Sequence, residues 1–124
     1  MKRALLVLAA CALLGLTPHS PVFVERDAAQ PIVVRAGEEF FIALPSNAST
    51  GYAWSQHLGN GAIAAYEGNV YEPAQSTAVG APGSQLFIYH ANRTGTTTIE
   101  LDYARSFDPN APAAKSLTFT LTVE

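Results

Sequence analysis

The 124-residue sequence contains a single cysteine, Cys11, so no disulfide can form within one chain. Basic residues are also scarce, with seven lysines and arginines against ten aspartates and glutamates. Removal of Lys2 and Arg3 leaves five basic residues against ten acidic ones, a formal net charge of −5. A mildly acidic chain of this kind is not expected to bind nucleic acid or an anionic membrane as its main partner.

Only one long apolar run is present, and it lies at the N-terminus. Residues 4–16 are almost wholly apolar and follow the basic start Met1-Lys2-Arg3, which is typical of a secretory signal. The run is shorter than the roughly 18 residues that a membrane-spanning helix needs. We therefore expect residues 1–20 to be a signal peptide and residues 21–124 to form a single exported domain, periplasmic or secreted.

Cys11 leaves two possibilities for the mature N-terminus. Residues 8–11, Leu-Ala-Ala-Cys, resemble a bacterial lipobox, in which Cys11 would carry a lipid that anchors the domain to the envelope. The run from Ala12 to Leu16 stays apolar, however, where lipoproteins usually turn polar at once. Ordinary cleavage near residues 17–21 is favoured, and it would remove the only cysteine.

Convergent catalytic or ligand-binding groups are not visible in the sequence. A catalytic site needs a nucleophile with its base, a carboxylate pair or a cluster of metal ligands. His57 and His90 stand alone in predicted strands, and Glu100 and Asp102 alternate on what should be a solvated sheet face. We therefore expect no enzymatic activity, no metal and no cofactor.

Strand periodicity dominates the mature chain. Residues 116–123 alternate polar and apolar without a break, which is typical of a half-buried strand. No segment after the signal shows helical periodicity over ten or more residues. Short strands punctuated by glycine, proline and asparagine predict an antiparallel sandwich or barrel. Further strands are predicted at residues 31–35, 39–44, 52–57, 85–91 and 97–103, with hairpin turns at 36–38 and 92–95.

Three segments are left over as loops: residues 45–51, 73–83 and 104–114. Long loops without structure of their own are commonly functional in a compact domain. The first holds Asn47, Thr50 and Gly51, which could also serve only as a turn. Function, if it lies anywhere, is expected in these loops.

The loops resemble those of the chagasin family, protein inhibitors of papain-like cysteine proteases. Residues 44–54, Leu-Pro-Ser-Asn-Ala-Ser-Thr-Gly-Tyr-Ala-Trp, resemble the family signature Leu-Pro-x-Asn-Pro-Thr-Thr-Gly-Phe/Tyr-x-Trp. Residues 80–83, Gly-Ala-Pro-Gly, are similar to its Gly-x-Gly-Gly loop, with Phe87 and Ala91 in the strand that leaves it. Residues 105–107, Arg-Ser-Phe, resemble its Arg-Pro-Trp loop.

This resemblance implies an immunoglobulin-like antiparallel β-sandwich whose three loops enter the protease cleft together as a monomeric, reversible and non-covalent inhibitor. Thr50 and Gly51 would lie against the catalytic Cys–His pair, the glycine loop near the non-primed pockets, and Phe107 against an aromatic of the primed side. The protease-binding residues implied in this way are Asn47, Ala48, Ser49, Thr50, Gly51, Tyr52, Gly80, Ala81, Pro82, Gly83, Arg105, Ser106 and Phe107.

An alternative function belongs to another class: a periplasmic or surface immunoglobulin-like adhesion or assembly module without a protease partner. Such a module would use hydrophobic or edge-strand contacts and would be indifferent to Thr50. Trp54 and Tyr103 are expected in the core under either reading, whereas the polar neighbours of Phe107 favour its exposure.

Overall fold

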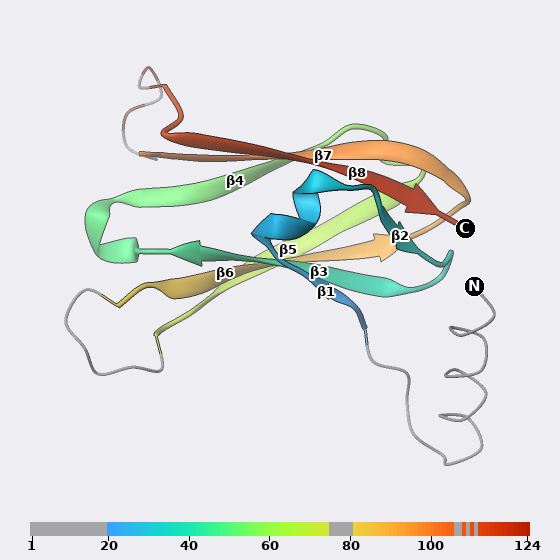
Figure 1. The fold of residues 1–124 in the computed structure, drawn as a ribbon, viewed down its shortest axis with the longest axis horizontal. Helices are drawn as coiled ribbons and strands as arrows, with labels where there is room; N and C mark the ends of the chain where they lie inside the picture. The colour runs from blue at the N-terminus through green and yellow to red at the C-terminus, as the bar shows by residue number, and fades with distance from the viewer. Residues whose placement is uncertain (1–19, 75–80, 106–107, 109, 111) are drawn as a thin grey trace, which may run out of the picture.

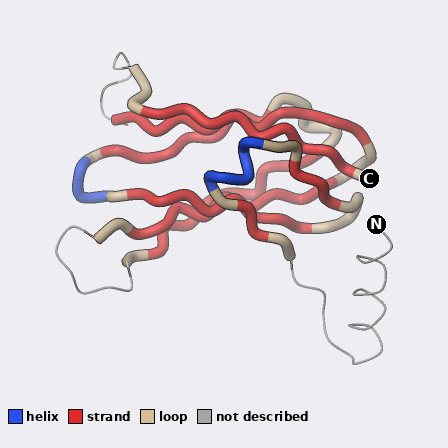
Figure 2. The backbone as a smooth tube through the Cα atoms, in the orientation of Figure 1, coloured by secondary structure: helices blue, strands red, loops and turns tan. Residues whose placement is uncertain are grey.

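The computed structural model describes residues 20–74, 81–105, 108, 110 and 112–124 (Figure 1). Two four-stranded sheets face each other, and strands run along most of the described chain (Figure 2). The described residues also contain two short helical turns. The predicted all-β sandwich is therefore confirmed, and the barrel alternative is wrong. The elements are β1 (Val22–Phe23), η1 (Glu25–Ala29), β2 (Ile32–Val34), β3 (Glu39–Ser46), η2 (Ala48–Thr50), β4 (Tyr52–Leu58), β5 (Ala64–Glu72), β6 (Gly83–Ala91), β7 (Gly95–Arg105) and β8 (Lys115–Val123).

The first sheet has the strand order β1-β3-β6-β5, and the second has the order β2-β8-β7-β4. The long neighbouring strands pair antiparallel, as predicted. The two short N-terminal strands are exceptions, because β1 runs parallel to β3 and β2 runs parallel to β8. None of the helical turns in the described residues is long and apolar enough to cross a membrane.

The predicted hairpin around residues 36–38 is wrong. β2 joins the second sheet and β3 joins the first, so this turn carries the chain from one sheet to the other. The amide of Gly37, whose φ is +90°, donates to the carbonyl of Ala91 at 2.7 Å, and the amide of Ala36 donates to Glu124 at 2.9 Å. Turn residues alone do not reveal which strand becomes the partner.

The hairpin predicted at residues 92–95 is wrong for the same reason. β6 belongs to the first sheet and β7 to the second, so the two segments face each other across the core. Gly95 does take a positive φ, +148°, as a tight turn requires. The amides of Asn92 and Arg93 both donate to the carbonyl of Ile63, which ties the crossing to the segment before β5.

The strand β5 was not predicted, and neither were β1 and η1. The sequence of β5 does not alternate cleanly because its register shifts between Tyr66 and Gly68, where one extra residue makes a bulge. Gly68 takes φ +128° at this point. A bulge moves every later side chain to the other face, so period-two patterning is lost across it.

The core lies between the sheets and is built from inward-facing residues of the long strands. In β7, Ile99 and Leu101 are fully buried and Glu100 is exposed, which confirms the alternation predicted for this strand. The largest fully buried side chains are Tyr89, Phe40, Phe87, Phe119, Ile42, Leu44, Ile99, Leu101 and Leu121.

Tyr89 is the one buried phenol, with no exposed area and a ring stacked 5.2 Å from that of Phe40. Its hydroxyl donates to the Oε1 of Gln56 at 3.1 Å, which joins the two sheets. Burial raises the pKa of Tyr89 well above its ordinary value of 10.0, and the nearby phenol of Tyr66 adds to the rise. The neutral form is therefore retained in the folded state.

We expect stability to fall at alkaline pH. Below about pH 10 the phenol is neutral in both states, whereas above it Tyr89 ionises only in the unfolded chain, so the free energy of unfolding drops by up to about 1.4 kcal/mol per pH unit. Urea unfolding between pH 8 and pH 12 measures this drop, and Tyr89→Phe should show a shallower one. Equal slopes in the two proteins would contradict the assignment.

Candidate functional site

The described strand ends that carry the three loops lie at the same end of the sandwich, on the left in Figure 1. The strand pairing explains why. Ser46, at the end of β3, pairs with Gly83, where the second loop ends, and Tyr52, at the start of β4, pairs with Arg105, where the third loop begins. The first loop crosses from one sheet to the other and therefore lies between the described ends of the second and third loops.

The bounds of the loops are narrower than the sequence indicated. Pro45 and Ser46 belong to β3, Gly83 to β6, and Ala104 and Arg105 to β7. The first loop is consequently residues 47–51, the second residues 73–82 and the third residues 106–114.

The first loop is a single helical turn held by its own side chains. The Asn47 Oδ1 atom accepts from the Ser49 hydroxyl at 2.7 Å and from the Ser49 amide at 3.3 Å. The Asn47 carbonyl accepts from the Thr50 amide at 3.2 Å and from the Thr50 hydroxyl at 2.7 Å. Side chains of Asn, Ser and Thr that bond their own backbone build such turns without help from the core.

Thr50 and Gly51 follow at the exit of this turn. Thr50 is exposed, and its hydroxyl donates to Asn47 while accepting weakly from the Tyr52 amide at 3.4 Å. A hydroxyl has one donor and two acceptor sites, so one acceptor remains for a partner. Gly51 takes φ +80°, which a residue with a Cβ adopts only with strain. The turn thus presents a hydroxyl acceptor next to bare backbone.

An aromatic column supports the first loop from the second sheet. The Tyr103 ring lies 4.9 Å from that of Trp54 on one side and 5.3 Å from that of Tyr52 on the other. The Arg105 guanidinium continues the column 5.3 Å above the Tyr52 ring. The Tyr103 hydroxyl accepts from the Asn47 amide at 3.2 Å, so the middle ring of the column bonds the first loop directly.

Trp54 is only 5% exposed, as predicted for a core residue, and connects the two sheets. Its indole N–H donates to the Pro45 carbonyl at 2.8 Å. Its backbone amide donates to the Gln85 Oε1 atom at 3.0 Å, and its carbonyl accepts from the Gln85 Nε2 atom at 2.9 Å. The Gln85 side chain therefore bonds the edge strand β4 in the way that a neighbouring strand would.

Gln85 and Tyr103 were missed as site residues by the sequence analysis. Gln85 occupies an inward position among Phe87, Tyr89 and Ala91, and a polar residue on an apolar face was the available signal. Tyr103 was expected in the core. It is half-buried and packs against the core, but its hydroxyl serves the loop.

The second loop is described only in part, because Gly80 lies outside the described residues. Pro82 is exposed and Ala81 half-buried. Gly83 is buried in β6, and a Cβ atom there would collide with the Glu72 carbonyl oxygen and with the Tyr71 ring. Gly83 therefore allows close packing at the base of the loop.

The third loop follows Arg105, the last residue of β7, which is exposed over Tyr52. Ser106 and Phe107 lie outside the described residues, as does the Ala48 side chain of the first loop. The amide of Asp108 donates to the Arg105 carbonyl at 3.3 Å. Arg105 thus brings a positive charge between the first and third loops.

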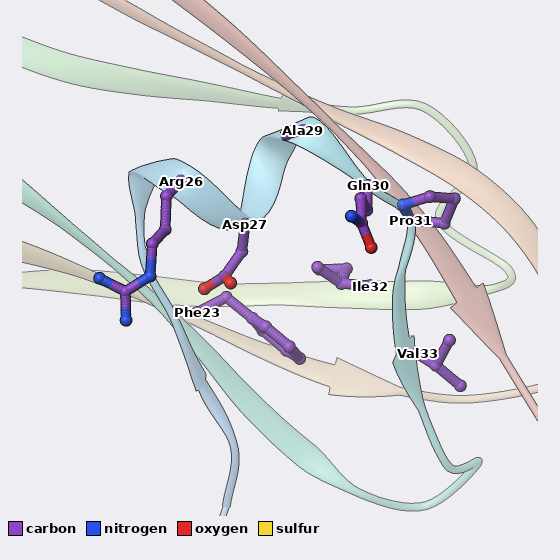
Figure 3. Close-up of a pocket in the computed structure, with 8 residues that line it drawn as sticks. All are labelled: Phe23, Arg26, Asp27, Ala29, Gln30, Pro31, Ile32 and Val33. Atoms are coloured by element: carbon purple, nitrogen blue, oxygen red, sulfur yellow. The ribbon is translucent and has the colours of Figure 1, made fainter.

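Other groups of the described residues do not form a comparable site. His57 is exposed, with its Nε2 atom 3.5 Å from the Asp102 Oδ2 atom, a surface pair of little energetic weight. No group of three or more possible metal ligands occurs in the described part of the chain. A shallow pocket lies between η1 and β2, away from the loops (Figure 3), and its Asp27 carboxylate already accepts from the Val24 amide at 2.7 Å.

Tyr103→Phe should loosen the first loop without unfolding the domain. It removes the acceptor of the Asn47 amide and leaves the aromatic column in place. A neutral hydrogen bond is worth about 0.5–1.5 kcal/mol, so the Asn47 amide should exchange with deuterium about two- to tenfold faster. Tyr89→Phe, which loses a bond in the core, is the matched control and should leave this rate unchanged. An unaltered Asn47 rate in Tyr103→Phe would show that the hydroxyl does not hold the loop.

Comparison with known proteins agrees with this architecture. Residues 33–123 match the model of the chagasin family peptidase inhibitor I42. The chain is 33% identical to chagasin of Trypanosoma cruzi over 95 residues, which cover 73% of this chain and 84% of that protein. It is 31% identical to amoebiasin-2 of Entamoeba histolytica over 83 residues, which cover 66% of this chain and 68% of that protein.

Solved structures have the same fold. The crystal structure of the cysteine protease inhibitor EhICP2 from Entamoeba histolytica superimposes with a TM-score of 0.72 at 25% identity and covers 87% of this chain and 100% of that one. PbICP-C, solved in complex with falcipain-2, shares the fold with a TM-score of 0.59 at 17% identity, over 87% of this chain and 93% of that one. With a family match over residues 33–123 and a matching sandwich whose described loop ends meet at one end, this chain belongs to the chagasin family of peptidase inhibitors.

Proposed function

We propose that this chain inhibits papain-like cysteine proteases by inserting the three loops into the active-site cleft. The single observation that carries the proposal is the position of the first loop, which lies between the other two and presents Thr50 and Gly51 at the end of the sandwich. A projecting end of the domain whose central turn is already ordered has a shape that can enter a cleft. The family match and the description of EhICP2 as a cysteine protease inhibitor support the choice of target. The adhesion-module alternative has no comparable support.

Thr50 is proposed to lie beside the catalytic thiolate–imidazolium pair. Its hydroxyl proton is used by the Asn47 carbonyl, so the oxygen would accept a bond from the imidazolium rather than donate one to the thiolate. Because Gly51 has no side chain, the backbone of the first loop could come closest to the protease active site at this residue. The first loop would therefore occupy the site through contacts alone, and inhibition would be reversible.

The second and third loops are proposed to contact the two walls of the cleft. In the second loop, Gly80, Ala81 and Pro82 would approach the non-primed side, with Gly83 at their base. At the third loop, Arg105 at the end of β7 would act with Ser106 and Phe107 on the primed side. The remaining proposed contacts are Asn47, Ala48 and Ser49 of the first loop and Tyr52 at the start of β4.

Differences from the family pattern bear on affinity. Ala48 stands where the family has proline, so the fixed φ of proline is lost from the first loop. The bonds that Asn47 makes with Ser49 and Thr50 supply a different form of rigidity. Loops ordered before binding lose less conformational entropy on binding. A Kd between micromolar and nanomolar, roughly −8 to −12 kcal/mol, is expected.

The domain is further proposed to act outside the cytoplasm as a monomer. Residues 1–20 would serve as the export signal and residues 21–124 would be the inhibitor, periplasmic or secreted. Cys11 would be lost with the signal, or else would carry a lipid. The acidic character of residues 21–124 would help to keep the free domain soluble.

Thr50 is the residue whose change should affect inhibition most directly. Titration of papain with residues 21–124 should show stoichiometric, reversible inhibition. A hydrogen bond to a charged partner is worth about 1.5–3 kcal/mol, so Thr50→Ala should raise the inhibition constant about ten- to a hundredfold. Thr50→Arg should raise it further, because its bulk cannot enter the cleft. The melting temperature should change little in either variant.

The control for Thr50→Arg is Thr98→Arg, at an exposed position on the outer face of β7 away from the loops. It adds the same charge and bulk and should inhibit like the unaltered domain. Full inhibition by a folded Thr50→Arg protein would show that the first loop does not enter the cleft. Lack of inhibition by the unaltered domain across several papain-family enzymes would refute the function itself.

The mature N-terminus should start near residues 17–21. Intact-mass spectrometry of the protein from its own host measures this directly. A diacylated Cys11 at the N-terminus would instead establish a lipid-anchored inhibitor, whose range would be limited to the surface of the producing cell.

A further inference from the structure

Tyr71 is an exposed aromatic residue at the loop end that the proposed contacts do not include. It is the penultimate residue of β5, next to the start of the second loop, and is 43% exposed. Among the described residues, the other exposed large hydrophobic side chains are Val22, Val33 and Val70. Val22 and Val33 belong to the short strands toward the opposite end of the sandwich (Figure 1). Tyr71 is thus the one exposed aromatic of this set, and it lies beside the candidate site.

The ring of Tyr71 rests on the backbone of β6. A Cβ atom built on Gly83 would collide with the Tyr71 hydroxyl and would come 2.7 Å from the Cζ atom of the ring. The aromatic side chain therefore lies across the one position in β6 that has no side chain. Contact with a rigid strand restricts the ring before any partner arrives, so binding would cost it little further conformational entropy.

Packing of the core does not account for the exposure of this ring. The residue opposite Tyr71 in β6 is Gln85, and its buried amide is already committed to the backbone of Trp54. Beyond Gln85 the inward position is Gly83 itself, paired with the buried Ser46. The core beneath Tyr71 is therefore already filled, and Tyr71 stays 43% exposed to solvent.

We propose that Tyr71 is a further protease-binding residue, which extends the contact of the second loop onto the end of β5. This inference rests on the proposed function. A fixed tyrosine offers a large apolar face with a polar tip, and aromatic residues of this kind are frequent energetic anchors of interfaces. It would pack on an apolar part of the protease surface beside the cleft, on the side of the second loop. The role of Gly83 in this proposal is to leave room for the Tyr71 ring, which a side chain at this position would displace.

The test compares variants of the two neighbouring exposed residues of β5. Tyr71 pairs with Gln85 on the inner face and Val70 pairs with Leu86 on the outer face, so Val70→Ala is the matched control. Tyr71→Ala should raise the inhibition constant for papain about tenfold, mainly through faster dissociation. Tyr71→Phe should retain most of the affinity, and Val70→Ala should leave it unchanged. Melting curves establish that each variant is folded at the assay temperature.

A second measurement does not depend on any variant. Hydroxyl-radical footprinting of the unaltered domain should show Tyr71 oxidised in the free protein and protected in the papain complex, with Val70 equally reactive in both. Unchanged oxidation of Tyr71 on binding, or unchanged affinity of Tyr71→Ala, would overturn the inference while leaving the inhibition by the three loops intact. Failure of the unaltered domain to inhibit would instead remove the proposed function and this inference with it.

Discussion

The side chain of Gln85 fixes the spacing of the two sheets at the loop end. Its amide accepts from and donates to the backbone of Trp54, so the first sheet holds the exposed edge of β4 as a paired strand would. Both bonds are buried, where an unmade bond costs about 1–3 kcal/mol, so the arrangement is strongly specified. The same contacts cover an edge that could otherwise pair with another chain.

The position of the first loop follows from this connection. Once Trp54 is held, its indole N–H bonds the Pro45 carbonyl near the end of β3, and its ring starts the column that includes Tyr103 and Tyr52. The column reaches the loop at the Asn47 amide. A rigid aromatic support beneath an exposed turn gives the shape required of an inhibitor, which must stay in the cleft without being reorganised. Local hydrogen bonds within the turn complete its order.

The strands and the core were largely predictable because alternation is a local property. Residues 97–103 and 116–123 form strands as their pattern indicated. The two hairpin predictions were wrong because a glycine turn between strands is compatible both with a hairpin and with a crossing between sheets. That choice depends on pairing between residues distant in sequence. β5 was hidden by its bulge, which interrupts the period on which the prediction relied.

The site could be predicted only through its motifs. Nothing in the local pattern of residues 44–54 shows that they lie beside Gly83 and Arg105, since this proximity arises from the sheet order. The residues that support or flank the loops were even harder to predict from the sequence. Gln85 was visible only as a polar residue in an apolar row, and Tyr71 lies in the strand that the sequence analysis missed. Support for a loop comes from other strands, so its own sequence does not reveal it.

A crystal structure of residues 21–124 bound to papain would show directly which face of the domain meets the protease. The loop end should face the cleft, with Thr50 beside the catalytic cysteine and histidine and the second and third loops on opposite sides of the cleft. A complex in which the domain binds through a sheet face or a strand edge, with the first loop in solvent, would contradict this expectation.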